Sequence, residues 1–285
     1  MSAREQIGRN PFSLGQSSGG IEVLESTDFG RIVRKYAGTD DTRFQVQYLK
    51  HVGALNLNLD HIQIPRIISE FAANSYTMEY MPGTPLGFFL EIATHQEVAS
   101  IAQTILQYFD QVLDMSRTKR IDEDLMSKIA ALEASFSKMK TLAPVIEDLL
   151  SNVKRAGKNC PPLEGWNHGD FSFENILVSV PGKPIVLIDF LDSPFESPLI
   201  DLGRFWLDAK FGWWASGMYP SSNASLNSKY IAEFVSVFCV EHSISEEDLA
   251  LFTGFAILRI YPYTKDPVRL AFLKNAAHEV MRLIK

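Results

Sequence analysis

Apolar and polar positions alternate along the first part of the chain, up to Met81, in the way expected of short β-strands. Residues 21–24 and 31–36 read as two strands separated by a turn at Phe29-Gly30, and residues 64–68 and 75–81 read as two more. Pro82-Gly83 closes this segment. The pattern therefore predicts a small β-rich lobe over residues 1–81.

One stretch of this lobe has helical rather than alternating spacing. Asp40-Asp41-Thr42 is a favourable helix start, and apolar side chains then fall on one face. Gly53 is expected to end this helix. The apolar positions are Phe44, Tyr48, Leu49 and Val52.

After Pro82-Gly83 the pattern changes to helical periodicity. Residues 97–115 carry an apolar stripe, and residues 122–139 and 143–156 repeat the amphipathic spacing. A loop-and-strand region over residues 166–190 interrupts the helices, which then continue to the C-terminus. We therefore predict an α+β protein, with the β-rich lobe followed by a larger helical lobe over residues 82–285.

Composition narrows the class of protein. The 285 residues are 46% hydrophobic and carry a net charge of −7, which argues against nucleic acid or an anionic membrane as the main partner. Two cysteines in a chain of this length do not suggest a disulfide scaffold. There is neither an apolar signal core near Met1 nor an uncharged run of about 18 residues that could span a membrane. We expect a cytoplasmic enzyme; nothing in the pattern indicates its oligomeric state.

The loop-and-strand region holds the most informative chemistry. His168-Gly169-Asp170 and Asn175 precede an apolar strand, and a second strand over residues 185–188 ends at Asp189. Adjacent strands would bring Asn175 and Asp189 together, with Asp170 at the mouth of the hairpin. An amide oxygen and a carboxylate are hard ligands suited to Mg²⁺, and the free carboxylate of Asp170 can take the proton of a hydroxyl nucleophile.

A purely structural interpretation competes with this one. Asp170 and Asn175 could be turn formers in a capped loop, but that interpretation does not explain why an aspartate follows the second buried strand. For His168, a hydrogen-bonding role that supports the loop is the simpler expectation, with a direct catalytic role as the alternative.

These residues resemble the catalytic and metal loops of the aminoglycoside phosphotransferase-like family within the protein-kinase-like superfamily. The resemblance carries His168-Gly169-Asp170, Asn175 and Ile188-Asp189-Phe190. It implies a two-lobed kinase fold, ATP or GTP as phosphoryl donor, Mg²⁺ as cofactor and Asp170 as base. It also implies that Asp201 braces the catalytic loop.

The resemblance extends into the β-rich lobe. Residues 15–20 look like the loop whose backbone N–H groups cover the nucleotide phosphates, with Ser17, Ser18 and Gly19 as contacts. Lys35 matches the strand lysine that holds the α- and β-phosphates. Glu79 and Met81 resemble the hinge that pairs with the adenine. The alternatives are a plain hairpin turn for the glycine loop, and Arg34 in place of Lys35 if the strand register shifts by one.

One position departs from the family pattern. A glutamate on the following helix usually pairs with the strand lysine, and here the matching position is Gln45. A glutamine oxygen can accept from an ammonium, but without the strength of a charge-assisted bond. This departure leaves open a slow or degenerate kinase.

The acceptor site is expected among the helices after Asp189, where aromatic and charged residues alternate. Most of these are explained by a helical core with snorkelling cations. Polycationic antibiotics require a strongly acidic pocket and choline-type substrates an aromatic cage, and the mixture of signs here fits a sugar, polyol or anionic metabolite at least as well. An amino alcohol is a further acceptor within the predicted class. The residues expected to line the site are Asp192, Asp208, Trp213 and Arg259.

The leading hypothesis is thus a kinase that phosphorylates a hydroxyl of a small metabolite, with a weak likeness to kinases of surface-carbohydrate metabolism. The alternatives are an aminoglycoside-resistance phosphotransferase and a nucleotide-binding regulatory module without activity. A protein substrate is disfavoured, because no Ala-Pro-Glu anchor follows Asp189.

Overall fold

The structure is a computed structural model, which describes residues 20–38, 41–72, 74–139, 142–179, 184–191, 193, 195–218 and 220–284. The chain divides into two compact units. The first comprises Met1–Leu57 and Ile64–Met81, and the second comprises Asn58–Gln63 and Pro82–Lys285. Each unit is described by itself below.

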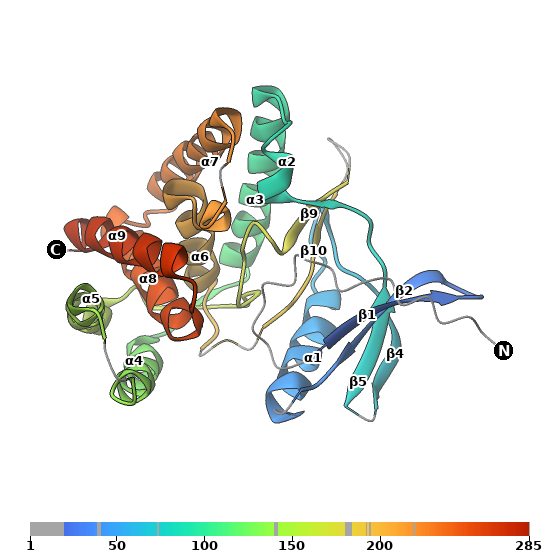
Figure 1. Cartoon of the computed structure of the whole chain (residues 1–285), viewed down its shortest axis with the longest axis horizontal. Helices are drawn as coiled ribbons and strands as arrows, with labels where there is room; N and C mark the ends of the chain where they lie inside the picture. The colour runs from blue at the N-terminus through green and yellow to red at the C-terminus, as the bar shows by residue number, and fades with distance from the viewer. Residues whose placement is uncertain are drawn as a thin grey trace. The chain divides into compact units, whose positions relative to one another are not determined.

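The first unit contains a four-stranded antiparallel sheet (Figure 1). Its strands lie in the order β1-β2-β5-β4, and the β1–β2 hairpin turns at Gly30, whose φ of 68° suits a glycine. The strands are β1 (Gly20–Ser26), β2 (Gly30–Tyr36), β4 (Ile67–Ala72) and β5 (Ser75–Glu79).

Helix α1 (Asp41–Leu55) packs on this sheet through an aromatic cluster. The Phe44 and Tyr76 rings lie 5.6 Å apart, and the Tyr48 ring lies 5.1 Å from Tyr76. The helix continues past Gly53 for two residues, so the predicted stop at Gly53 is wrong. A glycine costs about 1 kcal/mol inside a helix, which is small enough for packing to override in a last turn.

The pleat of β2 distinguishes Lys35 from Arg34. Lys35 and Val33 are buried on one face, whereas Arg34 is exposed on the other. Lys35 stands opposite Tyr76 in the ladder with β5, so its side chain shares the face that packs against α1. The register therefore presents Lys35, and not Arg34, on the inner face of the sheet.

A buried histidine, His51, ties α1 to this sheet. Its Nε2 lies 2.7 Å from the Pro65 carbonyl and its Nδ1 lies 3.4 Å from the Tyr76 hydroxyl. A carbonyl can only accept, so Nε2 carries the proton and Nδ1 accepts from Tyr76. Burial, with a smaller contribution from the charge of Lys35, lowers the pKa of His51 from 6.5 to about 4.

This lowered pKa predicts a loss of stability in mild acid. Between pH 6.5 and 4 the unfolded chain binds a proton at His51 that the folded chain does not, so the free energy of unfolding falls as the pH falls through this window. From pH 7.5 to 5 we expect a loss of about 2 kcal/mol from this group, measured by urea unfolding. The His51→Gln variant should lack that part of the pH dependence; identical pH dependence in both proteins would contradict the assignment.

The second unit contains a small mixed sheet in the order β3-β10-β9-β6. Strand β3 (Ile62–Gln63) pairs in parallel with β10 (Ile185–Leu187), which pairs antiparallel with β9 (Ile176–Val178). The strand predicted over residues 64–68 is wrong in its first part. Strand β3 ends at Gln63 and β4 begins only at Ile67, and residues 64–66 lie in no strand, because Pro65 has no N–H to donate to a ladder. Strand β6 (Thr84–Pro85) completes the sheet, and β7 (Arg117–Thr118) pairs separately with β8 (Leu163–Glu164).

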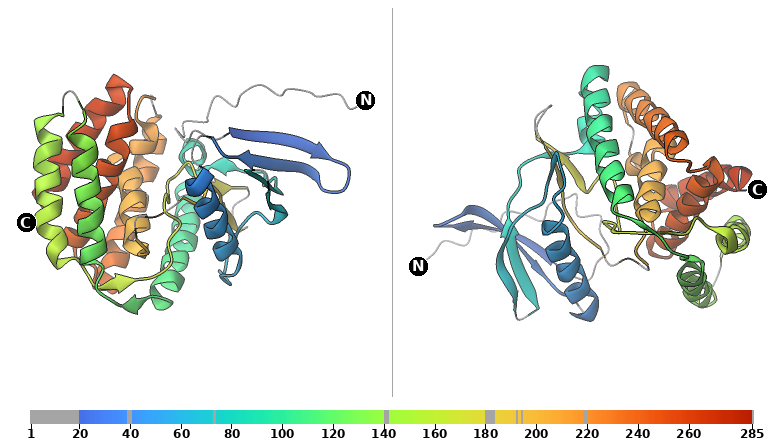
Figure 2. Two further views of the ribbon diagram at one scale, coloured as in Figure 1. Left: turned by 90° about the horizontal axis from the view of Figure 1, so that it is seen from below. Right: turned by 180° about the vertical axis from the view of Figure 1, so that it is seen from behind.

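Helices make up most of the second unit, and several lie side by side in Figure 2. Helix α6 is buried along almost its whole length. It crosses α8 at Gly203, where an added Cβ would come within 2.5 Å of the Phe252 carbonyl carbon. The helices are α2 (Leu86–Phe89), α3 (His95–Asp114), α4 (Asp122–Phe136), α5 (Pro144–Ala156), α6 (Pro198–Phe211), α7 (Ser222–Glu241), α8 (Glu246–Ile260) and α9 (Pro267–Leu283), with a 3₁₀ turn, η2 (Trp213–Ala215), after α6.

The predicted α+β architecture is confirmed, with a small antiparallel sheet first and a mainly helical region after it. The predicted helices over residues 97–115, 122–139 and 143–156 correspond to α3, α4 and α5. Among the described residues, no helix combines the length and the apolar character needed to cross a membrane.

Candidate functional site

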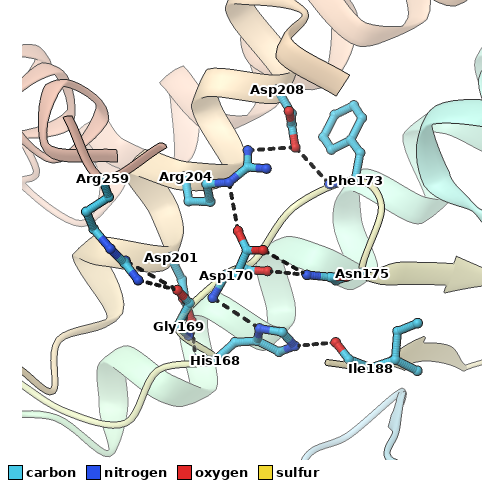
Figure 3. A network of polar contacts seen from close by, with 10 residues as sticks. All are labelled: His168, Gly169, Asp170, Phe173, Asn175, Ile188, Asp201, Arg204, Asp208 and Arg259. Atoms are coloured by element: carbon cyan, nitrogen blue, oxygen red, sulfur yellow. Dashed lines mark hydrogen bonds and ion pairs between the residues drawn. The ribbon is translucent and has the colours of Figure 1, made fainter. Parts of the chain in front are cut away.

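The candidate site lies in the second unit, where the loop before β9 meets the end of β10. The Ile188 N–H donates to the Asn175 carbonyl at 3.1 Å, extending the β9–β10 hairpin by one pair. Asn175 and Asp189 therefore lie at adjacent positions at the end of the hairpin. Asp170 lies on the same loop, directly beside Asn175 (Figure 3).

Asp170 is held in place from two sides. Its Oδ1 accepts from Arg204 Nε at 2.8 Å, and its Oδ2 accepts from Asn175 Nδ2 at 3.2 Å. The same Asn175 Nδ2 donates to the Asp170 backbone carbonyl at 2.9 Å. The side chain remains 30% exposed. Asp170 is thus an oriented carboxylate that a small molecule can reach.

The two residues expected to bind metal offer different oxygens. Both described hydrogen bonds of the Asn175 side chain use Nδ2, which leaves Oδ1 for another partner. Asp189 is half-buried and adopts φ of 63°, a left-handed conformation that costs a non-glycine residue energy and recurs at functional sites. No group of three His, Cys, Asp or Glu side chains suited to a metal occurs in the described parts of the chain. Two protein oxygens do fit Mg²⁺ bound largely through nucleotide phosphates and water.

Hydrogen bonds to the buried side chain of Asp201 stabilise the loop that carries Asp170. This buried carboxylate accepts from the backbone N–H groups of His168 and Gly169, the latter at 2.9 Å, and from the Tyr108 hydroxyl at 3.3 Å. Burial, together with the charge of Asp201, raises the pKa of Tyr108 well above its usual value, so it stays a donor. Asp201, at the start of α6, thereby fixes the loop conformation.

His168 and Gly169 have structural roles in the same loop. His168 is fully buried; its Nδ1 accepts from the Asp170 N–H at 3.3 Å, and its Nε2 therefore donates to the Ile188 carbonyl at 2.9 Å. Gly169 has φ of 92°, and a Cβ there would come within 2.2 Å of the Leu191 carbonyl oxygen. His168 thus links the Asp170 loop to the strand that delivers Asp189.

A buried ion pair on α6 supports Asp170 from the other side. Arg204 and Asp208 lie one helical turn apart, and their Nη1 and Oδ2 atoms are 3.0 Å apart. Asp208 also accepts from the Phe173 N–H at 2.8 Å (Figure 3). Burial raises the pKa of Asp208, although the charge of Arg204 opposes this rise. Burial alone would lower the pKa of Arg204, but the negative charges of Asp208 and Asp170 outweigh burial and raise the pKa of Arg204. Arg204 therefore remains charged beside Asp170.

The residues expected to line the acceptor site need correction. Asp208 is fully buried and paired with Arg204, so it cannot line an open site. Arg259 donates from both Nη atoms to the Gly169 carbonyl at 3.3 Å and so supports the loop. Trp213 is buried and contacts both the Phe272 ring and the guanidinium of Arg269. Asp192 lies outside the described residues.

The expected nucleotide contacts belong to the first unit. Ser17, Ser18 and Gly19 lie outside the described residues. Glu79 is the last residue of β5; its N–H donates to the Arg66 carbonyl at 2.9 Å and its carboxylate pairs with Arg66 at 3.2 Å. Met81 is two residues further on. Their roles, with that of Lys35, remain predictions.

Gln45 does not have the position predicted for it. It lies on the exposed side of α1, and no hydrogen bond joins it to Lys35 within the described residues, so the expected pairing is wrong. The face of α1 that packs on the sheet presents Phe44, Tyr48 and His51 instead. The apolar pattern determines the rotation of the helix about its axis only to within one residue, and a shift of one residue moves Gln45 from the sheet-facing side to the exposed side.

Arg204 is the site residue that sequence reasoning missed. Its signal is an arginine and an aspartate four residues apart in the middle of a helix that is mostly apolar. Such residues are rarely buried unless they are paired, so this spacing in a buried helix indicates an internal ion pair.

Comparison with known families agrees with this geometry. The Phosphotransferase enzyme family matches residues 10–219, and the chain belongs to this family. No curated protein matches the chain by sequence.

Solved structures share the fold at low sequence identity. A thermostable aminoglycoside phosphotransferase in complex with AMP-PNP and hygromycin B has a TM-score of 0.66 at 13% identity, covering 95% of this chain and 92% of that one. The GDP complex of an aminoglycoside 2'-phosphotransferase has a TM-score of 0.59 at 12% identity, covering 92% of both chains. A Plasmodium vivax ethanolamine kinase has a TM-score of 0.53 at 15% identity, covering 92% of this chain and 82% of that one.

Proposed function

We propose that this protein is a small-molecule kinase that transfers the γ-phosphoryl group of ATP or GTP to a hydroxyl of a small metabolite, such as a sugar, polyol or amino alcohol. The proposal depends most on one observation. The Asp170 carboxylate is partly exposed, fixed by Arg204 and Asn175, and placed beside the hairpin end that carries Asp189. Family membership supports the phosphotransferase class.

In the proposed reaction Asp170 accepts the proton of the acceptor hydroxyl as the oxygen attacks the γ-phosphorus. The bond between the γ-phosphorus and the β–γ bridging oxygen breaks, and ADP or GDP leaves. Arg204 and Asn175 hold its two oxygens in place, so the carboxylate does not need to reorient in the transition state. Asn175 Oδ1 and the Asp189 carboxylate would hold Mg²⁺, which when bound neutralises charge on the β- and γ-phosphates.

We assign the nucleotide to the β-rich lobe over residues 1–81 and the acceptor to residues 82–285. Lys35 would hold the α- and β-phosphates from the inner face of its sheet, and the backbone at Glu79 and Met81 would pair with the base. Related folds that bind ADP, GDP or AMP-PNP support a nucleotide donor.

A second candidate function is phosphorylation of aminoglycosides. Solved structures with this fold include aminoglycoside phosphotransferases bound to hygromycin B and to kanamycin, which favours this alternative. A nucleotide-binding module without transfer activity is a third possibility, and it predicts stabilisation by nucleotide without turnover.

A transfer assay over a panel of acceptors tests the proposal. Sugars, polyols, amino alcohols and aminoglycosides are each incubated with protein, Mg²⁺ and ATP or GTP, and the gain of one phosphoryl group is read by mass spectrometry. We expect at least one phosphorylated product. A raised melting temperature with nucleotide but no product from any acceptor would favour the inactive module instead.

A further inference from the structure

Arg269 lies in the first turn of α9, and contacts on two sides hold its guanidinium in place while Nη1 and Nη2 make no hydrogen bond with the described residues. Its Nε donates to the Ser216 carbonyl at 3.1 Å, and its guanidinium carbon lies 5.4 Å from the centre of the Trp213 ring. Its backbone N–H is capped by Asp266 at 2.8 Å. Nη1 and Nη2 make no hydrogen bond or ion pair with the described residues. A guanidinium fixed in this way loses little entropy when it binds a ligand.

The η2 turn places Arg269 near the Asp170 loop. Arg269 lies on Trp213, while the next residue, Trp214, stacks on Phe173 with ring centres 6.3 Å apart. Phe173 is in the loop, three residues after Asp170, and its N–H is the one that Asp208 accepts. The same turn therefore contacts both Arg269 and the loop that carries the proposed base.

The residue after Phe173, Glu174, gives a second indication of this proximity. Its side chain is exposed, and no hydrogen bond or ion pair joins it to the described residues. Desolvation by neighbouring groups and the negative charge of Asp208 raise the pKa of Glu174, whereas the positive charges of Arg204 and Arg269 oppose this rise. The charge of Arg269 thus contributes to the electrostatic environment of Glu174, which lies four residues after Asp170.

The surroundings of Trp213 do not suit a cationic group of an acceptor. One face of Trp213 is already covered by Arg269, so a quaternary ammonium cannot stack there. Arg204 and Arg259 add two more guanidiniums beside the loop, and each is engaged with it. The planar fork of Arg269 instead matches a carboxylate or a phosphate, which it can bind through both Nη atoms.

We propose that Arg269 binds an anionic group, a carboxylate or a phosphate, of the acceptor, and thereby selects hydroxylated acids over neutral or cationic alcohols. The inference rests on the proposed function, since it assigns the acceptor of the same transfer. The hydroxyl would face Asp170 while the anionic group lies against the guanidinium on Trp213.

Acceptor pairs that differ only in the anionic group test this inference. The pairs are glycerol with glycerate and ethanolamine with serine, assayed by phosphoryl transfer with the wild type, Arg269→Met and Arg269→Lys. We expect the wild type to prefer the anionic member in kcat/KM. Arg269→Met should lose about 10- to 100-fold with that member, the range for a charge-assisted hydrogen bond, with its KM for ATP unchanged. Arg269→Lys should retain part of the preference.

A matched control is Arg282→Met, which removes an exposed arginine of the same helix that pairs with Glu279; it should behave as wild type. Preferential transfer to neutral or cationic members would overturn the inference and leave the proposed function standing. If no acceptor is phosphorylated, the proposed function fails, and a binding measurement then tests the anion site at Arg269 separately. In that case glycerate and serine should raise the melting temperature of the wild type more than glycerol and ethanolamine do, and this difference should be lost in Arg269→Met. Equal increases in melting temperature with all four compounds would overturn the inference.

Discussion

Asp170→Asn should lower kcat by about 10²- to 10⁴-fold, because an amide cannot take the proton of the attacking hydroxyl. The substitution keeps the size of the side chain, and the amide oxygen can still accept from Arg204. The melting temperature and the affinity for nucleotide should therefore change little. The measurement is kcat for the best acceptor in the transfer panel, with folding checked by thermal unfolding.

The matched control is Asp114→Asn, the same chemical change at an exposed residue at the end of α3. It should leave kcat unchanged. Equal turnover by Asp170→Asn and the wild type would remove Asp170 from the role of base.

The second large effect is on stability. Arg204→Met should lower the free energy of unfolding by about 3–5 kcal/mol, because it leaves the carboxylate of Asp208 buried without its partner. Activity should fall as well, since Asp170 loses the donor that orients it. Urea unfolding at neutral pH measures the effect. Arg282→Met breaks an exposed pair, which contributes less than about 1 kcal/mol.

A double variant separates stability from orientation. Arg204→Met with Asp208→Asn removes both buried charges, while an amide oxygen can still accept from the Phe173 N–H. Much of the lost stability should return, but not the lost activity, because Asp170 still lacks its guanidinium. If Arg204→Met alone were as stable as the wild type, the stabilising role inferred for the buried Arg204–Asp208 pair would be wrong.

The order of the elements could be predicted from the sequence because hydrophobic periodicity is strong in α3 and α5 and in the hairpin of β1 and β2. Short strands that pair with distant parts of the chain could not be predicted from the sequence. Strand β3 has two residues, and its parallel partner β10 lies more than a hundred positions further along the chain. Two residues carry no readable alternation, and their pairing is determined by tertiary contacts.

The proximity of Asp170, Asn175 and Asp189 was predictable because a dense polar cluster directly before two apolar strands has few structural explanations. The residues that hold the Asp170 loop in place were harder to predict from the sequence. Arg204 and Asp208 resemble surface residues of an amphipathic helix until α6 is known to be buried on all sides. The helical phase of α1 is also ambiguous in the sequence. The pattern predicts Gln45 on the sheet-facing side of α1, where the structure presents Phe44 and Tyr48.

We propose that the β9–β10 hairpin end binds a divalent ion together with a nucleotide. Titration with Mn²⁺, a paramagnetic substitute for Mg²⁺, tests this proposal most directly. Free Mn²⁺ is titrated by electron paramagnetic resonance with ADP and either the wild type, Asp189→Asn or Asp114→Asn. The account predicts that the wild type and Asp114→Asn sequester Mn²⁺ with ADP, and that Asp189→Asn does so more than about tenfold less tightly. Equal binding of Mn²⁺ and ADP by Asp189→Asn and the wild type would contradict it.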